Sequence, residues 1–132
     1  SVKLSGLKAL ERVVIGEKSF ANSTGGLQVS GCEALRELSV GKDSFVKYSV
    51  FGVSGVPLLE SLRVEEGSFR DGSELRLEGL SGLKRVVIGD DSFAGFDVIE
   101  IASVPVLEEV QIGANCFATA SFELKGRVRW IV

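Results

Sequence analysis

Histidine and methionine are absent from the 132 residues, and cysteine occurs only twice. Without histidine, the side chain used most often as a general base and as a zinc ligand is missing. Two cysteines are too few for the disulfide framework of a small secreted domain. Because a complete primary translation product begins with methionine, we expect the chain to be a processed product or a piece of a longer protein.

Neither sign of charge is in large excess, since 15 basic and 18 acidic residues give a net charge of −3. This balance argues against binding to nucleic acid, which requires a concentrated basic face, and against electrostatic attachment to a membrane. No apolar run approaches the roughly 20 residues that span a bilayer. No signal peptide precedes the first repeat, but in a piece of a longer protein that absence says nothing about the compartment.

A strict internal repeat is what the sequence does contain. Phenylalanine recurs at Phe20, Phe45, Phe69, Phe93 and Phe117, in steps of 25, 24, 24 and 24 residues. Three more apolar columns precede each phenylalanine at fixed distances. They are Leu10, Leu35, Leu59, Leu83, Leu107; Val13, Leu38, Leu62, Val86, Val110; and Ile15, Val40, Val64, Ile88, Ile112. Such self-similarity at a fixed period predicts a repeat architecture.

A second alternating block follows each phenylalanine. Its two main columns are Leu27, Phe51, Leu75, Ile99, Phe122 and Val29, Val53, Leu77, Ile101, Leu124. Two short alternating stretches per repeat predict two half-buried strands, and the glycines between them predict turns. We therefore expect one domain, 1–132, of five coils and a partial sixth. The coil boundaries are 2–26, 27–50, 51–74, 75–98, 99–121 and 122–132.

A coil of this kind cannot bury its apolar face alone, so we expect the coils to stack over one continuous core. Each strand then pairs in parallel with its counterpart in the next coil. The predicted fold is an all-β solenoid of the leucine-rich-repeat type, with two short parallel sheets, about 24 residues per coil and little or no helix. In the partial last coil, Trp130 falls on the leucine column and is predicted to cover the open end of the core.

The segments 35–45 and 83–93 resemble the leucine-rich repeat signature L-x-x-L-x-L-x-x-N-x-L, with phenylalanine in the last position. Their Ile-Gly-x-x-Ser-Phe type of ending is similar to the repeats of bacterial and protist surface proteins. One departure is that the asparagine column reads Lys18, Asp43, Gly67, Asp91, Asn115. The resemblance implies a scaffold for binding or structure, with its ligand contacts on a strand face, and implies no catalytic chemistry or cofactor.

The first exposed column of the expected strand face alternates in sign: Glu11, Arg36, Glu60, Lys84, Glu108. The next column reads Arg12, Glu37, Ser61, Arg85, Glu109, and the third reads Val14, Ser39, Arg63, Val87, Gln111. Neighbours in a column lie about 4.8 Å apart, within reach of cross-strand ion pairs. One interpretation is a solvated, self-neutralising ladder, and the other is a docking face for a partner protein. The partner-binding candidates on this face are Glu11, Arg12, Arg36, Glu37, Glu60, Arg63, Lys84 and Arg85.

Tyr48 and Phe96 occupy equivalent positions in two expected loops, where an aromatic side chain either contacts a partner or folds back over the core. Cys32 and Cys116 replace small core residues and lie too far apart along the stack for a disulfide. Asn22-Ser23-Thr24 is an N-glycosylation sequon in an expected loop, which favours a secreted or cell-surface location. No glycine-rich nucleotide loop and no metal-ligand spacing occurs in the sequence.

Two functions are compatible with these features. The first is a non-catalytic scaffold that binds another protein and that neither enters a membrane nor binds nucleic acid. The second is a structural segment of a surface or filament assembly that self-associates through the solenoid ends, because neither end carries an evident polar cap.

Overall fold

The structure is a computed structural model that describes residues 1–72, 74–95, 98–117 and, as backbone, 129–131. The described residues form strands and turns and contain no helix. Five strands form the first sheet: β1 (Val2–Ser5), β3 (Thr24–Ser30), β5 (Lys47–Ser54), β7 (Glu74–Glu78) and β9 (Val98–Ala102). Six form the second: β2 (Arg12–Ile15), β4 (Glu37–Val40), β6 (Ser61–Val64), β8 (Arg85–Ile88), β10 (Glu109–Ile112) and β11 (Arg129–Ile131).

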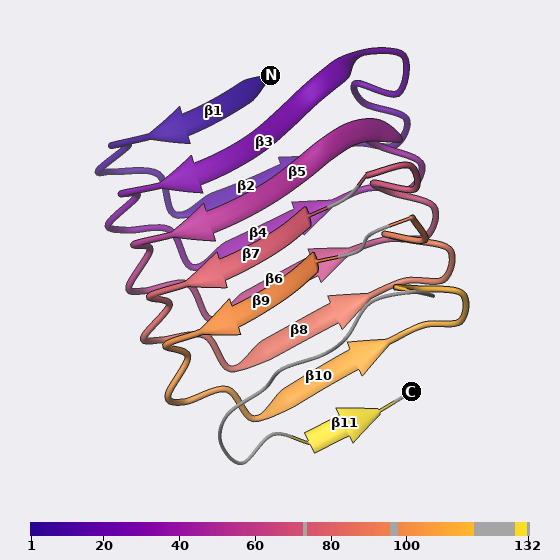
Figure 1. Cartoon of the computed structure of the whole chain (residues 1–132). Coiled ribbons are helices and arrows are strands. Elements are labelled where there is room, and N and C mark those ends of the chain that lie inside the picture. The colour runs from indigo at the N-terminus through magenta and orange to yellow at the C-terminus, as the bar shows by residue number, and fades with distance from the viewer. Residues whose placement is uncertain (73, 96–97, 118–128, 132) are drawn as a thin grey trace.

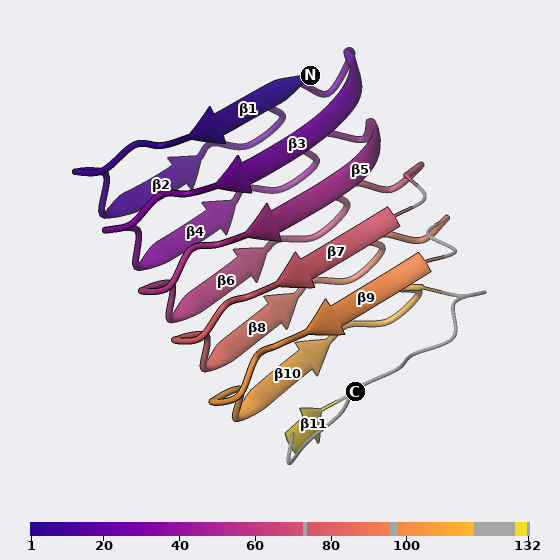
Figure 2. The ribbon, with the colours of Figure 1, turned by 60° about the vertical axis from the view of Figure 1, so that its left-hand side comes forward.

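The chain alternates between the two sheets, so that each coil contributes one strand to each (Figure 1). Figure 2 shows the two sheets as two layers whose strands run in opposite directions. Every strand pairs in parallel with its counterpart in the next coil, as Val13 does with Leu38 and Leu38 with Leu62. The predicted all-β solenoid, with two parallel sheets and about 24 residues per coil, is confirmed.

The predicted apolar columns fill the space between the sheets. Leu35, Leu59 and Leu83 have 0% of their surface exposed, and the alternate residues of the strands are buried in the same way. Side chains that alternate along a strand point to opposite faces, so one face of each sheet enters the core and the other meets solvent. The first coil departs from this pattern, because Leu7 and Phe20 are 41% and 47% exposed.

The phenylalanine column stacks along the whole solenoid. The ring centroids of Phe45 and Phe69 are 5.2 Å apart and those of Phe69 and Phe93 are 5.1 Å apart, with rings nearly parallel. All three side chains are fully buried, as predicted. Each phenylalanine also has a positive φ of 52° to 55°, which is rare for a residue with a Cβ. The stacked rings therefore hold a backbone conformation that a single coil would not favour.

Glycine meets a steric requirement at two corners of the coil. Gly55 has a φ of +59°, as do its equivalents in neighbouring coils to within a few degrees. At Gly41, an added Cβ would lie 2.8 Å from the backbone of Gly16 and Glu17 in the preceding coil. A side chain at that position would push two coils apart.

Strand β11 joins the second sheet in a register that the sequence did not predict. Trp130 lies beside Val110, so it continues the column of Val110 and not the leucine column of Leu107. The prediction failed because Trp130 follows Val110 by 20 residues, whereas Val110 follows Val86 by 24. The predicted positions of Phe122, Leu124 and Arg127 and the side chain of Trp130 lie outside the described residues.

Candidate functional site

The exposed side of the second sheet carries most of the predicted binding residues. We call it the charged face, and it consists of the positions in and just before β2, β4, β6, β8 and β10 whose side chains lie on the side of the sheet away from the core. Its members are Glu11, Arg12, Val14, Arg36, Glu37, Ser39, Glu60, Ser61, Arg63, Lys84, Arg85, Val87, Glu108, Glu109 and Gln111. The parallel register sets these residues in three columns, as the sequence predicted.

Ion pairs connect neighbouring coils across part of the charged face. Arg12 Nε lies 3.1 Å from Glu37 Oε2, and Arg85 Nε lies 3.4 Å from Glu109 Oε2. In the adjacent column, whose residues directly precede the strands, Arg36 Nη1 lies 3.5 Å from Glu60 Oε1. At least one side chain of each pair is more than half exposed, so each pair contributes only about 0–1 kcal/mol to stability.

Glu60 has the predicted neighbours but, among the described residues, forms an ion pair with just one of them. Its backbone bonds to Arg36 on one side and to Lys84 on the other, which confirms the predicted position in the column. The carboxylate forms an ion pair with Arg36. Neither Lys84 nor Arg63 has an ion-pair partner among the described residues.

Tyr48 is not a surface residue, and its predicted place on a loop is wrong. It lies in β5 with 1% of its surface exposed, and its ring packs 4.8 Å from that of Phe45. Its partner in the neighbouring strand is Gly25, which has no side chain to occupy the same space, and the register shifts just after it. Of the two interpretations of this aromatic, folding back over the core is therefore the one observed. Phe96 lies outside the described residues.

Asn22 lies exposed in the turn before β3. The hydroxyl of Ser23 donates to the carbonyl of Phe20 at 3.3 Å, and Thr24 begins the strand. The sequon asparagine is therefore accessible to a modifying enzyme.

A buried serine column was not recognised from the sequence as a hydrogen-bonding element. The hydroxyl of Ser68 donates to the Gly41 carbonyl of the preceding coil at 2.8 Å, and it accepts the Ser44 amide at 3.3 Å. Ser44 makes the equivalent bond to the Gly16 carbonyl at 2.9 Å. The serine that directly precedes the phenylalanine in the first four coils was the available signal, because a buried hydroxyl needs a partner.

Both cysteines are free thiols, as predicted. Cys32 is fully buried in the core, whereas Cys116 is only half-buried and takes the place of serine in the last coil of the column. Its thiol donates to the Gly89 carbonyl at 3.2 Å. Burial raises the pKa of Cys116, and the carboxylates of Asp90 and Asp91 add to that increase. A neutral thiol of this kind is a poor nucleophile at neutral pH.

Other kinds of site find little support in the described part of the chain. There, no group of three histidine, cysteine, aspartate or glutamate residues is placed to hold a metal ion. No helix long and apolar enough to cross a membrane occurs in those residues either.

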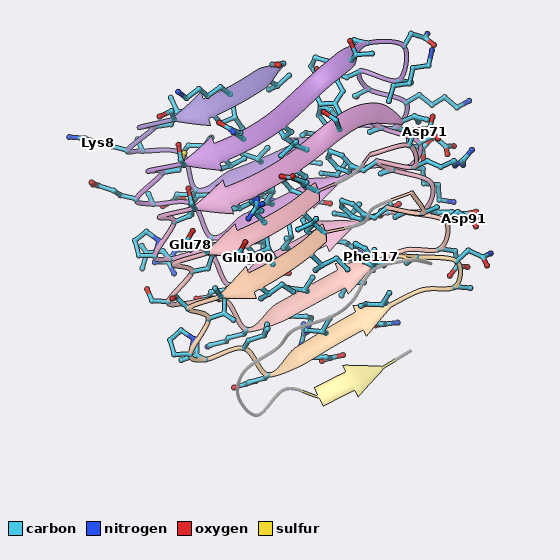
Figure 3. All side chains as sticks on the ribbon, in the orientation of Figure 1. Lys8, Asp71, Glu78, Asp91, Glu100 and Phe117 are labelled. Carbon is cyan, nitrogen blue, oxygen red and sulfur yellow. The ribbon has the colours of Figure 1, made fainter. Side chains whose placement is uncertain are left out.

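Figure 3 shows charged side chains projecting from the corners, with Lys8 at one corner and Asp71 and Asp91 at the opposite one.

The fold places the chain among the parallel β-solenoid repeat proteins, a class defined by identical coils stacked over one core. No family model, curated protein or solved structure matches the chain.

Proposed function

We propose that the chain is a non-catalytic scaffold of the leucine-rich-repeat type that binds another protein through the charged face. This proposal rests on one observation, which is that the two sides of the second sheet have different roles. The side chains that hold the coils together are buried, whereas most of the charged side chains are exposed, and the ion pairs among them contribute little to stability. A rigid backbone that presents exposed side chains at fixed spacing is suited to recognition, because little ordering is needed on binding.

The test is a selection of ligands followed by mapping of where they bind. Random peptides displayed on phage are selected against the folded chain, and the tightest are titrated into the labelled protein while its amide resonances are followed. We expect saturable binding with shifts concentrated in β4, β6 and β8. An absence of saturable binding, or shifts confined to the exposed side of β3, β5 and β7, would contradict the proposal.

A second candidate is assembly through the end of the solenoid, and the first coil supplies the observation that favours it. Phe20 is 47% exposed, whereas the equivalent Phe45 one coil further is fully buried. Among the described strands, β1 and β2 each have a neighbour on one side only. A strand edge beside exposed apolar residues is a template for a further coil, which either the same protein or another chain can supply.

Sedimentation velocity over a range of concentrations tests this second candidate. Self-association that is abolished by Phe20→Asp and retained by Val14→Asp would support it, because Val14 is also exposed but lies on the charged face. A monomer at every concentration, or equal effects of both substitutions, would reject it.

A further inference from the structure

The central part of the charged face contains two cations that form no ion pair with another described residue. Arg63 lies on β6 and Lys84 directly precedes β8, the neighbouring strand. Both side chains are exposed, and neither takes part in an ion pair among the described residues. Arg63 is also the only charged residue in its column, where its neighbours are the half-buried Ser39 and Val87.

Two ion pairs of the charged face lie on either side of Ser61 and Arg63 and involve neither residue. In the column of Ser61, Glu37 pairs with Arg12 towards the first coil, and Arg85 pairs with Glu109 towards the last. Ser61 itself lies between Glu37 and Arg85 and carries no charge. Glu37 and Arg85 therefore both form their ion pairs with residues on the side away from Ser61. Arg63, two residues after Ser61 on the same side of β6, has no ion-pair partner among the described residues.

We infer that Arg63 and Lys84 form a docking site for a protein segment that carries one or two isolated carboxylates next to an apolar residue. Arginine binds a carboxylate through two parallel hydrogen bonds and is enriched among the residues that dominate binding energy at interfaces. Val87, beside Arg63 in the same column, offers the apolar contact. This inference rests on the proposed function and specifies the partner's chemistry.

The same face argues against a polyanion as the partner. Glu37, Glu60, Glu108 and Glu109 surround the two cations on neighbouring positions of the sheet. A nucleic acid or a sulfated polysaccharide would bring many negative charges against these carboxylates, and like charges brought together oppose binding. A segment with isolated carboxylates separated by neutral residues meets the cations without meeting the glutamates.

The experiment compares the same displayed peptide library on the chain and on charge-reversed variants. Peptides selected on the unmodified chain are expected to be enriched in single aspartate or glutamate residues beside apolar ones. Arg63→Glu should weaken their binding at least about tenfold, the effect of losing one moderately strong ionic contact. Replacing the peptide carboxylate by lysine should restore binding to the Arg63→Glu chain, because the charges are then exchanged.

Lys8→Glu is the matched control. It makes the same change in net charge at an exposed residue on a corner of the solenoid, away from the sheet faces (Figure 3), and it should leave the affinity unchanged. Circular dichroism melts of all variants check that the fold is retained.

Two results would overturn the inference. One is a set of saturable peptides whose affinity Arg63→Glu and Lys84→Glu leave unchanged, which would leave the proposed scaffold function intact but place the site elsewhere. The other is selection of runs of acidic residues that heparin displaces, which would identify a polyanion site. If no peptide binds saturably, the proposed function fails together with the inference.

Discussion

Replacing Phe69 with alanine should destabilise the chain more than the same change at any exposed member of its column. Phe69 is fully buried, and its ring stacks on Phe45 at 5.2 Å, on Phe93 at 5.1 Å and on Phe51 at 4.8 Å. Removing a buried phenylalanine costs about 3–5 kcal/mol, which includes the cavity that is left. With three aromatic neighbours affected, we expect a value towards the upper end of that range.

Phe20→Ala is the matched control, because Phe20 has the same positive φ but is 47% exposed and stacks closely only on Phe45, at 5.0 Å. Its loss should cost roughly half as much, about 1.5–2.5 kcal/mol. Urea denaturation followed by circular dichroism measures both values. If Phe69→Ala does not fold, Phe69→Leu retains part of the volume and should still lose more than Phe20→Leu. Equal losses at the two positions would refute the stacked column as the main support of the core.

Three further predictions concern the serine column and the charged face. Ser68→Ala should cost about 2–3 kcal/mol in urea denaturation, because it leaves the half-buried Gly41 carbonyl and the buried Ser44 amide without their partner. Ser19→Ala, which removes only a local bond in the first coil, should cost under about 1 kcal/mol, and equal costs would disprove the ladder. Because the pKa of Cys116 is raised in the folded chain, its contribution to stability is complete below the thiol pKa of the unfolded chain and declines as the pH rises towards the folded value. As the pH rises from about 8 to about 10, the melting temperature of the Cys116→Ser chain should therefore fall less than that of the unmodified chain. Identical plots of melting temperature against pH would contradict the raised pKa of Cys116. Glu60→Gln should change the free energy of unfolding by under about 1 kcal/mol, because both members of its pair with Arg36 are half-exposed; a larger loss would give the charged face a structural role.

The strands and the core were predictable because one physical rule repeats in every coil. Alternation of apolar and polar residues determines which side of a strand is buried, and a constant spacing determines which strands pair. Leu38, for example, could be placed beside Val13 and Leu62 from position alone. The columns of Ser61 and Arg63 on the charged face follow from the same rule, whereas the column of Glu60 lies just before the strands.

Other features depend on local geometry that the repeat does not encode. Tyr48 is buried because Gly25 lies beside it at a register shift, and the repeat pattern contains no sign of that irregularity. Trp130 pairs with Val110 because the connection to the last strand is shorter than a full coil. The ion pairs depend on side-chain conformations, so alternation in sign predicted the pair of Arg36 with Glu60 but equally predicted a pair of Glu60 with Lys84, which does not form.

The distribution of charge on the charged face is difficult to explain by stability alone. Backbone hydrogen bonds, the phenylalanine column and the serine column hold each coil to the next, and none of them uses an exposed side chain of that face. The column of Glu60 alternates in sign through the central coil, as a face shaped for mutual neutralisation would. The adjacent column does not, because Ser61 interrupts its alternation, and Arg63, two residues after Ser61, forms no ion pair with another described residue. The side chains of Ser61 and Arg63 take part in none of these contacts between coils, and a carboxylate on a partner protein, as proposed above, would supply a counterion for Arg63.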